Sequence, residues 1–343
     1  MAEFTSFSGR KRQLAGNGVR KAEFHEIPMI SLTHPEPNII EQLRDACTRV
    51  GFFYIKDHGV SQEVIDGIFE TAERFFDQPL ETKSEIHYKL SKVLHGYEPI
   101  SEVRTDESKR ADLNEAFNCG YEPDLDPVPY DAEAAFHEAS SMDGPNAWPR
   151  MPGFKQNVAA YYGQVLMLAR RLVRLFAQVL GLPATYFDSA VTRPGAMLRL
   201  LKYPAQDPKD PEALGIGAHT DIELFTILCQ GSQPALQILN THGQWIEAPP
   251  TPGTFVVNIG DMLARWTNDV FISTVHRVHN CTGQERYSVP FFFGPSYGTM
   301  LRTLPTCVPD GEIAGYQPIL AGDYVWRRLA QSRLTEAEQH TFA

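Results

Sequence analysis

The sequence predicts an α+β fold in which the C-terminal half is mainly β, a jelly roll or a small barrel. From residue 197 to residue 293, short apolar runs recur with turn residues between them, a spacing typical of closed β folds. The N-terminal half has helical periodicity instead, and a long amphipathic helix from about 154 to 180 lies between the two parts. The expected strands are 197–203, 215–221, 224–230, 235–239, 245–248, 254–259, 273–278 and 286–293.

The N-terminal elements alternate between strand and helix. A short strand is expected at 27–32, and apolar residues at helical spacing predict a helix at 38–50. The run Gly51-Phe52-Phe53-Tyr54-Ile55 predicts a buried strand. Ser61 is a good N-cap for a second helix, which Pro79 closes.

These patterns divide the chain into five segments. Residues 88–150 are rich in charge, proline and glycine, so we expect loops with short elements, and long loops on a compact enzyme often border its active site. The segments are a tail or N-terminal arm (1–25), an N-terminal region with loops near the active site (26–150), a long supporting helix (151–194), the barrel (195–300) and a C-terminal segment (301–343).

Composition argues against several classes of partner. The chain has 343 residues and a formal net charge of −11, whereas a nucleic-acid partner requires a clustered basic surface. The basic run Arg10-Lys11-Arg12 is interpreted as a solvated tail. The apolar segment 161–182 contains three arginines, so it is not expected to span a membrane. Five scattered cysteines without CxxC spacing favour a reducing compartment, so we expect a cytoplasmic protein.

Three residues in the C-terminal half are candidate metal ligands. His219 and Asp221 are two apart on an expected strand, so their side chains would point together with Thr220 turned away. A neutral imidazole beside a carboxylate makes two thirds of the two-histidine-one-carboxylate site of non-haem Fe(II) oxygenases. His276, on the expected strand 273–278, is the candidate third ligand. An isolated histidine is most often structural, but this order of residues on strands favours a metal site.

A candidate carboxylate-binding pair follows ten residues after His276. Arg286 and Ser288 are again two apart on an expected strand. A guanidinium group offers a rigid fork that matches a carboxylate, and the hydroxyl adds a further donor. Such a pair beside an Fe(II) site is what a 2-oxo acid cosubstrate requires.

Together these motifs resemble the isopenicillin N synthase-like branch of Fe(II)/2-oxoglutarate-dependent oxygenases, over about residues 27–297. The resemblance implies a double-stranded β-helix (a jelly roll) flanked by helices, with iron held by His219, Asp221 and His276. It also implies that Arg286, Ser288 and Tyr203 bind the distal carboxylate of 2-oxoglutarate, with O2 as the oxidant. The matching motifs include Gly51-Phe52-Phe53, His58-Gly59-Val60, Phe75 to Pro79, Leu201-Lys202-Tyr203-Pro204, His219-Thr220-Asp221, Asn258-Ile259-Gly260-Asp261, Ser273 to Val278 and Arg286-Tyr287-Ser288.

Two positions depart from the family pattern. The family often has Asn-Tyr-Tyr-Pro where this chain has Leu201-Lys202-Tyr203-Pro204, so an asparagine contact to the cosubstrate is missing. It often has glycine where this chain has Glu223. We expect Glu223 to be a solvent-facing strand residue, with a substrate contact as the alternative.

Side chains alternate between the two faces of a strand, so residues two apart share a face, and this alternation indicates candidate substrate contacts. Arg199 shares a strand face with Tyr203, and because a charge inside a barrel is costly unless paired, it is expected to bond a polar or anionic substrate group. An internal ion pair with Asp or Glu is nearly as well favoured. Phe292 shares a face with Ser288 and is a candidate apolar wall. Phe117 and Phe225 are weaker candidates, because core packing explains them equally well.

The resemblance implies that the protein oxidises a C–H bond of a small organic molecule. It is strongest to fungal small-molecule hydroxylases, including thymine hydroxylase-like enzymes, which favours a nucleobase-type substrate or the tailoring of a secondary metabolite by hydroxylation. Desaturation, cyclisation or ring expansion at the same site is the alternative. An oxidase that needs no 2-oxoglutarate and a non-catalytic binding barrel are rivals. The sequence does not indicate an oligomeric state.

Overall fold

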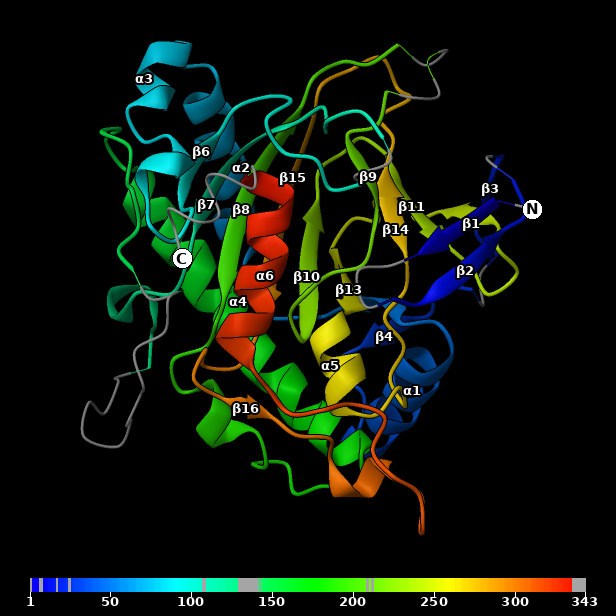
Figure 1. Ribbon diagram of the computed structural model, residues 1–343. Coiled ribbons are helices and arrows are strands. Elements are labelled where there is room, and N and C mark those ends of the chain that lie inside the picture. Colours follow the sequence, from blue (N-terminus) through cyan, green and yellow to red (C-terminus); the bar gives the residue numbers. More distant parts are fainter. Residues whose placement is uncertain are drawn as a thin grey trace.

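The computed structural model describes residues 2–5, 9–16, 18–23, 26–106, 109–128, 142, 144–207, 210 and 213–334 (Figure 1). Parts of the expected N-terminal arm, of the expected loop region 88–150 and of the C-terminal segment therefore lie outside the described residues. Within the described residues, no helix has the length and apolar character needed to cross a membrane.

The C-terminal half forms the predicted jelly roll from two facing sheets. All eight expected strands are present, although several are shorter than expected. The major sheet has the order β4 (Met29–Ser31), β5 (Phe52–Lys56), β13 (Thr254–Ile259), β10 (Phe225–Gln230), β15 (Arg286–Phe293), β8 (Met197–Tyr203), β7 (Glu115–Cys119) and β6 (Gly96–Glu98). The minor sheet has the order β3 (Val19–Lys21), β12 (Trp245–Glu247), β11 (Leu236–Leu239), β14 (His276–Val278) and β9 (Ile216–His219).

Three helices support the back of the major sheet. They are α1 (Glu36–Arg49), α2 (Gln62–Phe76) and α4 (Phe154–Val179), close to the predicted ranges. The apolar face of α4 contributes Val158, Leu172 and Phe176 to the core that these helices share with the sheet. Gly181 follows with a φ of 72°, a left-handed conformation that ends a helix and favours glycine. The helices hold the sheet rigid from behind, so the site can lie in front of it.

The N-terminal residues form an arm that contains strands. β1 (Ala2–Thr5) and β2 (Lys11–Leu14) pair as an antiparallel hairpin, and β3 extends the minor sheet by parallel pairing with β12. Arg10 pairs with Asp269. Lys11 and Arg12 are exposed to solvent, as the sequence predicted, but the segment is not a free tail, because strand pairing and the Arg10 ion pair fix its described part to the fold.

The C-terminal half also contains two helices. The short helix α5 (Asp261–Trp266) directly follows β13. The last helix, α6 (Ala321–Arg333), lies across the open front of the major sheet, where Figure 1 shows it in red before β8 and β10. Remaining short elements are α3 (Leu80–Ser84), β16 (Met300–Leu301) paired with β17 (Ile319–Leu320), and 3-10 turns at Tyr88–Leu90, Pro123–Leu125, Asp188–Val191 and Pro305–Cys307.

Candidate active site

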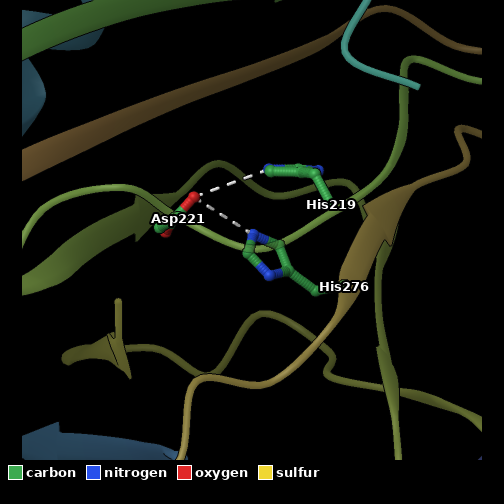
Figure 2. A group of neighbouring side chains, drawn as sticks. All are labelled: His219, Asp221 and His276. Carbon is green, nitrogen blue, oxygen red and sulfur yellow. Dashed lines mark ion pairs between the residues drawn. The ribbon is translucent and has the colours of Figure 1, made fainter. Parts of the chain in front are cut away.

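His219, Asp221 and His276 meet at the mouth of the jelly roll (Figure 2). β9 and β14 pair so that His219 and His276 are direct cross-strand partners, with ring centroids 4.2 Å apart. Asp221 Oδ1 lies 3.5 Å from Nε2 of His219 and 3.6 Å from Nε2 of His276. The three ligand atoms lie within 4.8 Å of one another, so the three side chains converge as the ligands of a single cation do.

Hydrogen bonds fix which atom each side chain presents. Nδ1 of His219 lies 2.8 Å from the carbonyl of Gly217, and Nδ1 of His276 lies 3.2 Å from that of Thr274. Because Nδ1 donates to these carbonyls, the lone pair of each ring is on Nε2. Asp221 accepts bonds at Oδ2 from Thr226 (2.5 Å) and Asn258 (2.6 Å). Its other oxygen, Oδ1, therefore remains directed at the histidines.

The turn after β9 directs Asp221 toward the histidines. Asp221 lies beyond the end of β9, so the expected strand 215–221 is too long. Thr220 donates to Asp261 at 2.8 Å and is turned away, as predicted, while the N–H of Asp261 donates to the carbonyl of Asp221 at 2.7 Å. The Asn258-to-Asp261 motif thus holds both the side chain and the backbone of Asp221.

The charges of the three residues suit a divalent cation. Burial alone would raise the pKa of Asp221, but the neighbouring His276 and His219 and the bond from Asn258 outweigh it and lower the pKa. Burial and the nearby His219 lower the pKa of His276 to about 4. At neutral pH Asp221 is therefore a carboxylate and His276 a neutral imidazole, the forms that coordinate metals.

Arg286, Ser288 and Tyr203 form a second cluster in the same cavity. The pairing of β15 with β8 sets Arg286 opposite Tyr203, with its guanidinium 4.7 Å from the ring centroid. Arg286 donates to Ser288 Oγ at 3.3 Å, and Ser288 Oγ lies 3.5 Å from the Tyr203 hydroxyl. Arg286 is 1% exposed, and no carboxylate among the described residues pairs with it. A buried, unpaired guanidinium fits a carboxylate ligand.

The rest of the cavity wall is largely apolar. Phe292 lines it as expected, next to Pro290 on β15. Phe117 and Phe225 do not, because both belong to the core behind the major sheet, where Phe117 contacts Phe75 and Phe225 contacts Phe176. The suggestion that these two residues contact substrate is therefore wrong. Apolar residues of the wall include Phe52, Met197, Leu201, Ile216, Leu228, Leu236 and Val278.

Arg199 lines the cavity within a buried cluster of charges. Its Nη2 donates to Glu98 on β6 at 2.7 Å, and Nε of Arg333 on α6 donates to the same carboxylate at 2.6 Å. The internal ion pair, the alternative in the sequence analysis, is thus present. Two arginines share one carboxylate, so Arg199 still presents positive charge to the cavity.

Glu223 does not face solvent, contrary to expectation. It is 3% exposed and lines the cavity beside Asp221. Burial and the charge of Asp221 raise its pKa to about 8. The expectation failed because Glu223 lies in the turn before β10, where the alternation of a strand does not apply.

Sequence reasoning missed residues that come from distant segments. Glu98 and Arg333 gave no local signal, because each is separated from its partner by a long stretch of chain. Asp112 also lines the cavity and accepts bonds from Thr105 and from the N–H of Gly217, which ties the loop before β7 to β9. The role of Asn258 could have been found, because its motif was recognised in the sequence.

A jelly roll with two histidines and one carboxylate at its mouth defines the site class of non-haem Fe(II) oxygenases. A family model for the N-terminal part of a non-haem dioxygenase in morphine synthesis matches residues 27–151, and one for the 2OG-Fe(II) oxygenase superfamily matches 194–295. The oxidoreductase ppzC of Metarhizium rileyi, described as of 2-oxoglutarate-Fe(II) type, is 38% identical over 91% of this chain and 88% of its own.

Solved structures agree with this relationship. A full-length protein of Neurospora crassa, crystallised in complex with alpha-KG (2-oxoglutarate), has a TM-score of 0.77 and 29% identity, covering 89% of this chain and 96% of that one. Another structure of the same Neurospora crassa protein, with alpha-KG and thymine, has a TM-score of 0.76 over the same shares. The chain belongs to the 2-oxoglutarate–Fe(II) oxygenase superfamily. It is an oxidoreductase whose cofactors are Fe(II) and 2-oxoglutarate.

Proposed function

We propose that the protein hydroxylates a C–H bond of a small organic molecule held between the two sheets. One observation carries this proposal: the His219–Asp221–His276 triad and the unpaired Arg286 line the same cavity. A metal and a dicarboxylate can therefore bind side by side. The remaining wall combines apolar residues with charged and polar ones, which suits a small molecule with an apolar body and a polar group.

Each residue of the site has a distinct role in this proposal. His219, Asp221 and His276 would hold iron through Nε2, Oδ1 and Nε2, while Asn258 and Thr226 keep Asp221 oriented. Arg286 would bind the distal carboxylate of 2-oxoglutarate, with Ser288 and Tyr203 as further donors. Phe292 would contact the apolar body of the substrate, and the helix α6 would limit access of water.

Iron and 2-oxoglutarate, when bound, supply the oxidising chemistry: one oxygen atom of O2 enters the product alcohol, the other enters succinate, and CO2 is released. The chain's own contribution is to position the substrate. Three protein ligands leave open coordination positions for 2-oxoglutarate and O2, as in other two-histidine-one-carboxylate sites.

A metabolite panel with Fe(II), ascorbate and 2-oxoglutarate tests the proposal. Hydroxylation requires succinate and a product that has gained one oxygen atom. A product that has lost two hydrogen atoms would indicate the alternative of desaturation or cyclisation. Product without succinate would indicate a 2-oxoglutarate-independent oxidase, and no turnover of any compound would favour the binding barrel.

We infer the substrate class and setting from the same features. The structure of the Neurospora crassa protein with thymine supports a nucleobase-type molecule, and the likeness to ppzC leaves a fungal secondary metabolite as the other candidate. A cytoplasmic location is proposed because all five cysteines are free thiols, which suits a reducing compartment.

A further inference from the structure

The carboxyl group of Glu223 differs from the other described carboxyl groups in or beside the cavity. Asp221 accepts bonds from Thr226 and Asn258, and Asp112 from Thr105 and Gly217. Glu98 is held by two arginines. Among the described residues, by contrast, no side chain forms a hydrogen bond or ion pair with Glu223, although it is 3% exposed. Its own backbone N–H bonds the carboxyl group.

The position of Glu223 in the chain determines where its carboxyl group lies. The side chain begins two residues after Asp221, and its Cβ and Cγ pack against the backbone at Gly294, which closes that side. Arg199 and Arg333 are near enough to act on its charge, but both bond Glu98 instead. The carboxyl group therefore faces the cavity next to the metal ligands.

A buried carboxyl group that no other residue bonds costs stability, so its presence in a ligand cavity points to a ligand that completes it. We propose that Glu223 determines substrate specificity by accepting a hydrogen bond from an N–H group of the substrate. This inference rests on the proposed function, because the bonded group would then lie close to the C–H bond that is oxidised.

The chemistry of the cavity favours an N–H group over other donors. Arg199 and Arg333 line the same cavity and carry N–H groups besides those that bond Glu98, so carbonyl, carboxylate or hydroxyl oxygens of a ligand can bond there. A hydroxyl group can rotate to accept from an arginine. An amide or guanidinium N–H can only donate, and Glu223 is an acceptor near the metal site that no other described residue bonds.

Matched pairs of small compounds test this inference. Each pair consists of a lactam, cyclic imide or secondary amide with a free N–H and the same compound with the nitrogen methylated. Compound-dependent succinate formation is measured with the wild-type enzyme, Glu223→Gln and Glu223→Leu. The exposed Glu70→Gln on α2 is the matched control. Visible absorption of the Fe(II)–2-oxoglutarate complex is recorded first for each protein.

We expect the wild-type enzyme to prefer N–H compounds by about tenfold, the effect of one buried hydrogen bond. Glu223→Leu, which cannot accept a bond, should lose this preference, and Glu223→Gln should keep part of it through its carbonyl oxygen. The melting temperature of ligand-free Glu223→Leu should not fall, because no other described residue bonds the carboxyl group. A structural role would lower it.

Other results overturn the inference. A wild-type enzyme that responds to no N–H compound, or equally to both members of each pair, contradicts it. An unchanged preference in Glu223→Leu does so too. A wild-type protein that fails to form the Fe(II)–2-oxoglutarate complex contradicts the proposed function instead, which separates the two failures.

Discussion

His219 and His276 are direct partners across the antiparallel pair β9 and β14, with their rings 4.2 Å apart. Cross-strand partners share one face of a sheet, so strand register alone brings the two imidazoles together. Asp221 has no such constraint, because it lies in the turn beyond β9. Its orientation depends on the bonds that it accepts, and these bonds are the first to test.

Asn258→Ala should weaken metal binding about 10- to 100-fold, the usual effect of removing a group that orients a ligand. Asn258 holds Asp221 Oδ2 at 2.6 Å, so without it the carboxylate can rotate away from the histidines. Titration with Co(II), followed by its visible absorption, gives the dissociation constant. Asn38→Ala, an exposed position on α1, is the control. Equal affinity in the two variants would show that Thr226 alone suffices.

Arg286→Lys should weaken 2-oxoglutarate binding about tenfold or more although the charge is kept, because lysine lacks the planar fork that matches a carboxylate. The buried Arg286 also bonds the carbonyl of Gln233 and Ser288, so its position is fixed before the ligand arrives. Absorption titration of the Fe(II) protein measures the affinity. The exposed Arg49→Lys should bind as the wild type does, and equal binding by both variants would remove Arg286 from the cosubstrate site.

The sequence predicted those parts of the structure that depend on local pattern. The jelly-roll strands and the meeting of His219, Asp221 and His276 were predicted, because alternation and motif spacing act over a few residues. The cavity wall was predicted less well. Period-two alternation does not say which face of a strand meets the cavity, so Phe117 was misplaced. The contact of Arg333 with Glu98 spans 235 residues and depends on where α6 docks, which no local pattern encodes.

Arg333→Met should loosen α6 from the front of the barrel. The buried Arg333 links α6 to Glu98 on β6, and its loss leaves the carboxylate with Arg199 alone. A hydrogen bond between charged groups contributes about 1.5–3 kcal/mol, so amide hydrogen exchange in α6 should quicken markedly. Mass spectrometry of exchange by peptide measures this. The exposed Arg327→Met on the same helix is the control, and equal exchange in both variants would show that apolar contacts alone hold α6.

Stability should fall on acidification because of His95, a buried residue just before β6. Burial lowers the pKa of His95 to about 4, whereas the unfolded chain protonates this ring near pH 6.5. Above pH 6.5 neither state carries the proton, so this contribution to stability is fully present there. As the pH falls from 6.5 to 4, the unfolded state gains a proton that the folded state excludes, and roughly 3 kcal/mol of stability is lost. Below pH 4 both states are protonated and the loss ends.

Urea unfolding at pH 7 and pH 5 measures the change. His95→Asn should show a smaller loss over the same interval, since the other titrating groups remain, and an identical loss in both proteins would contradict the assignment to His95.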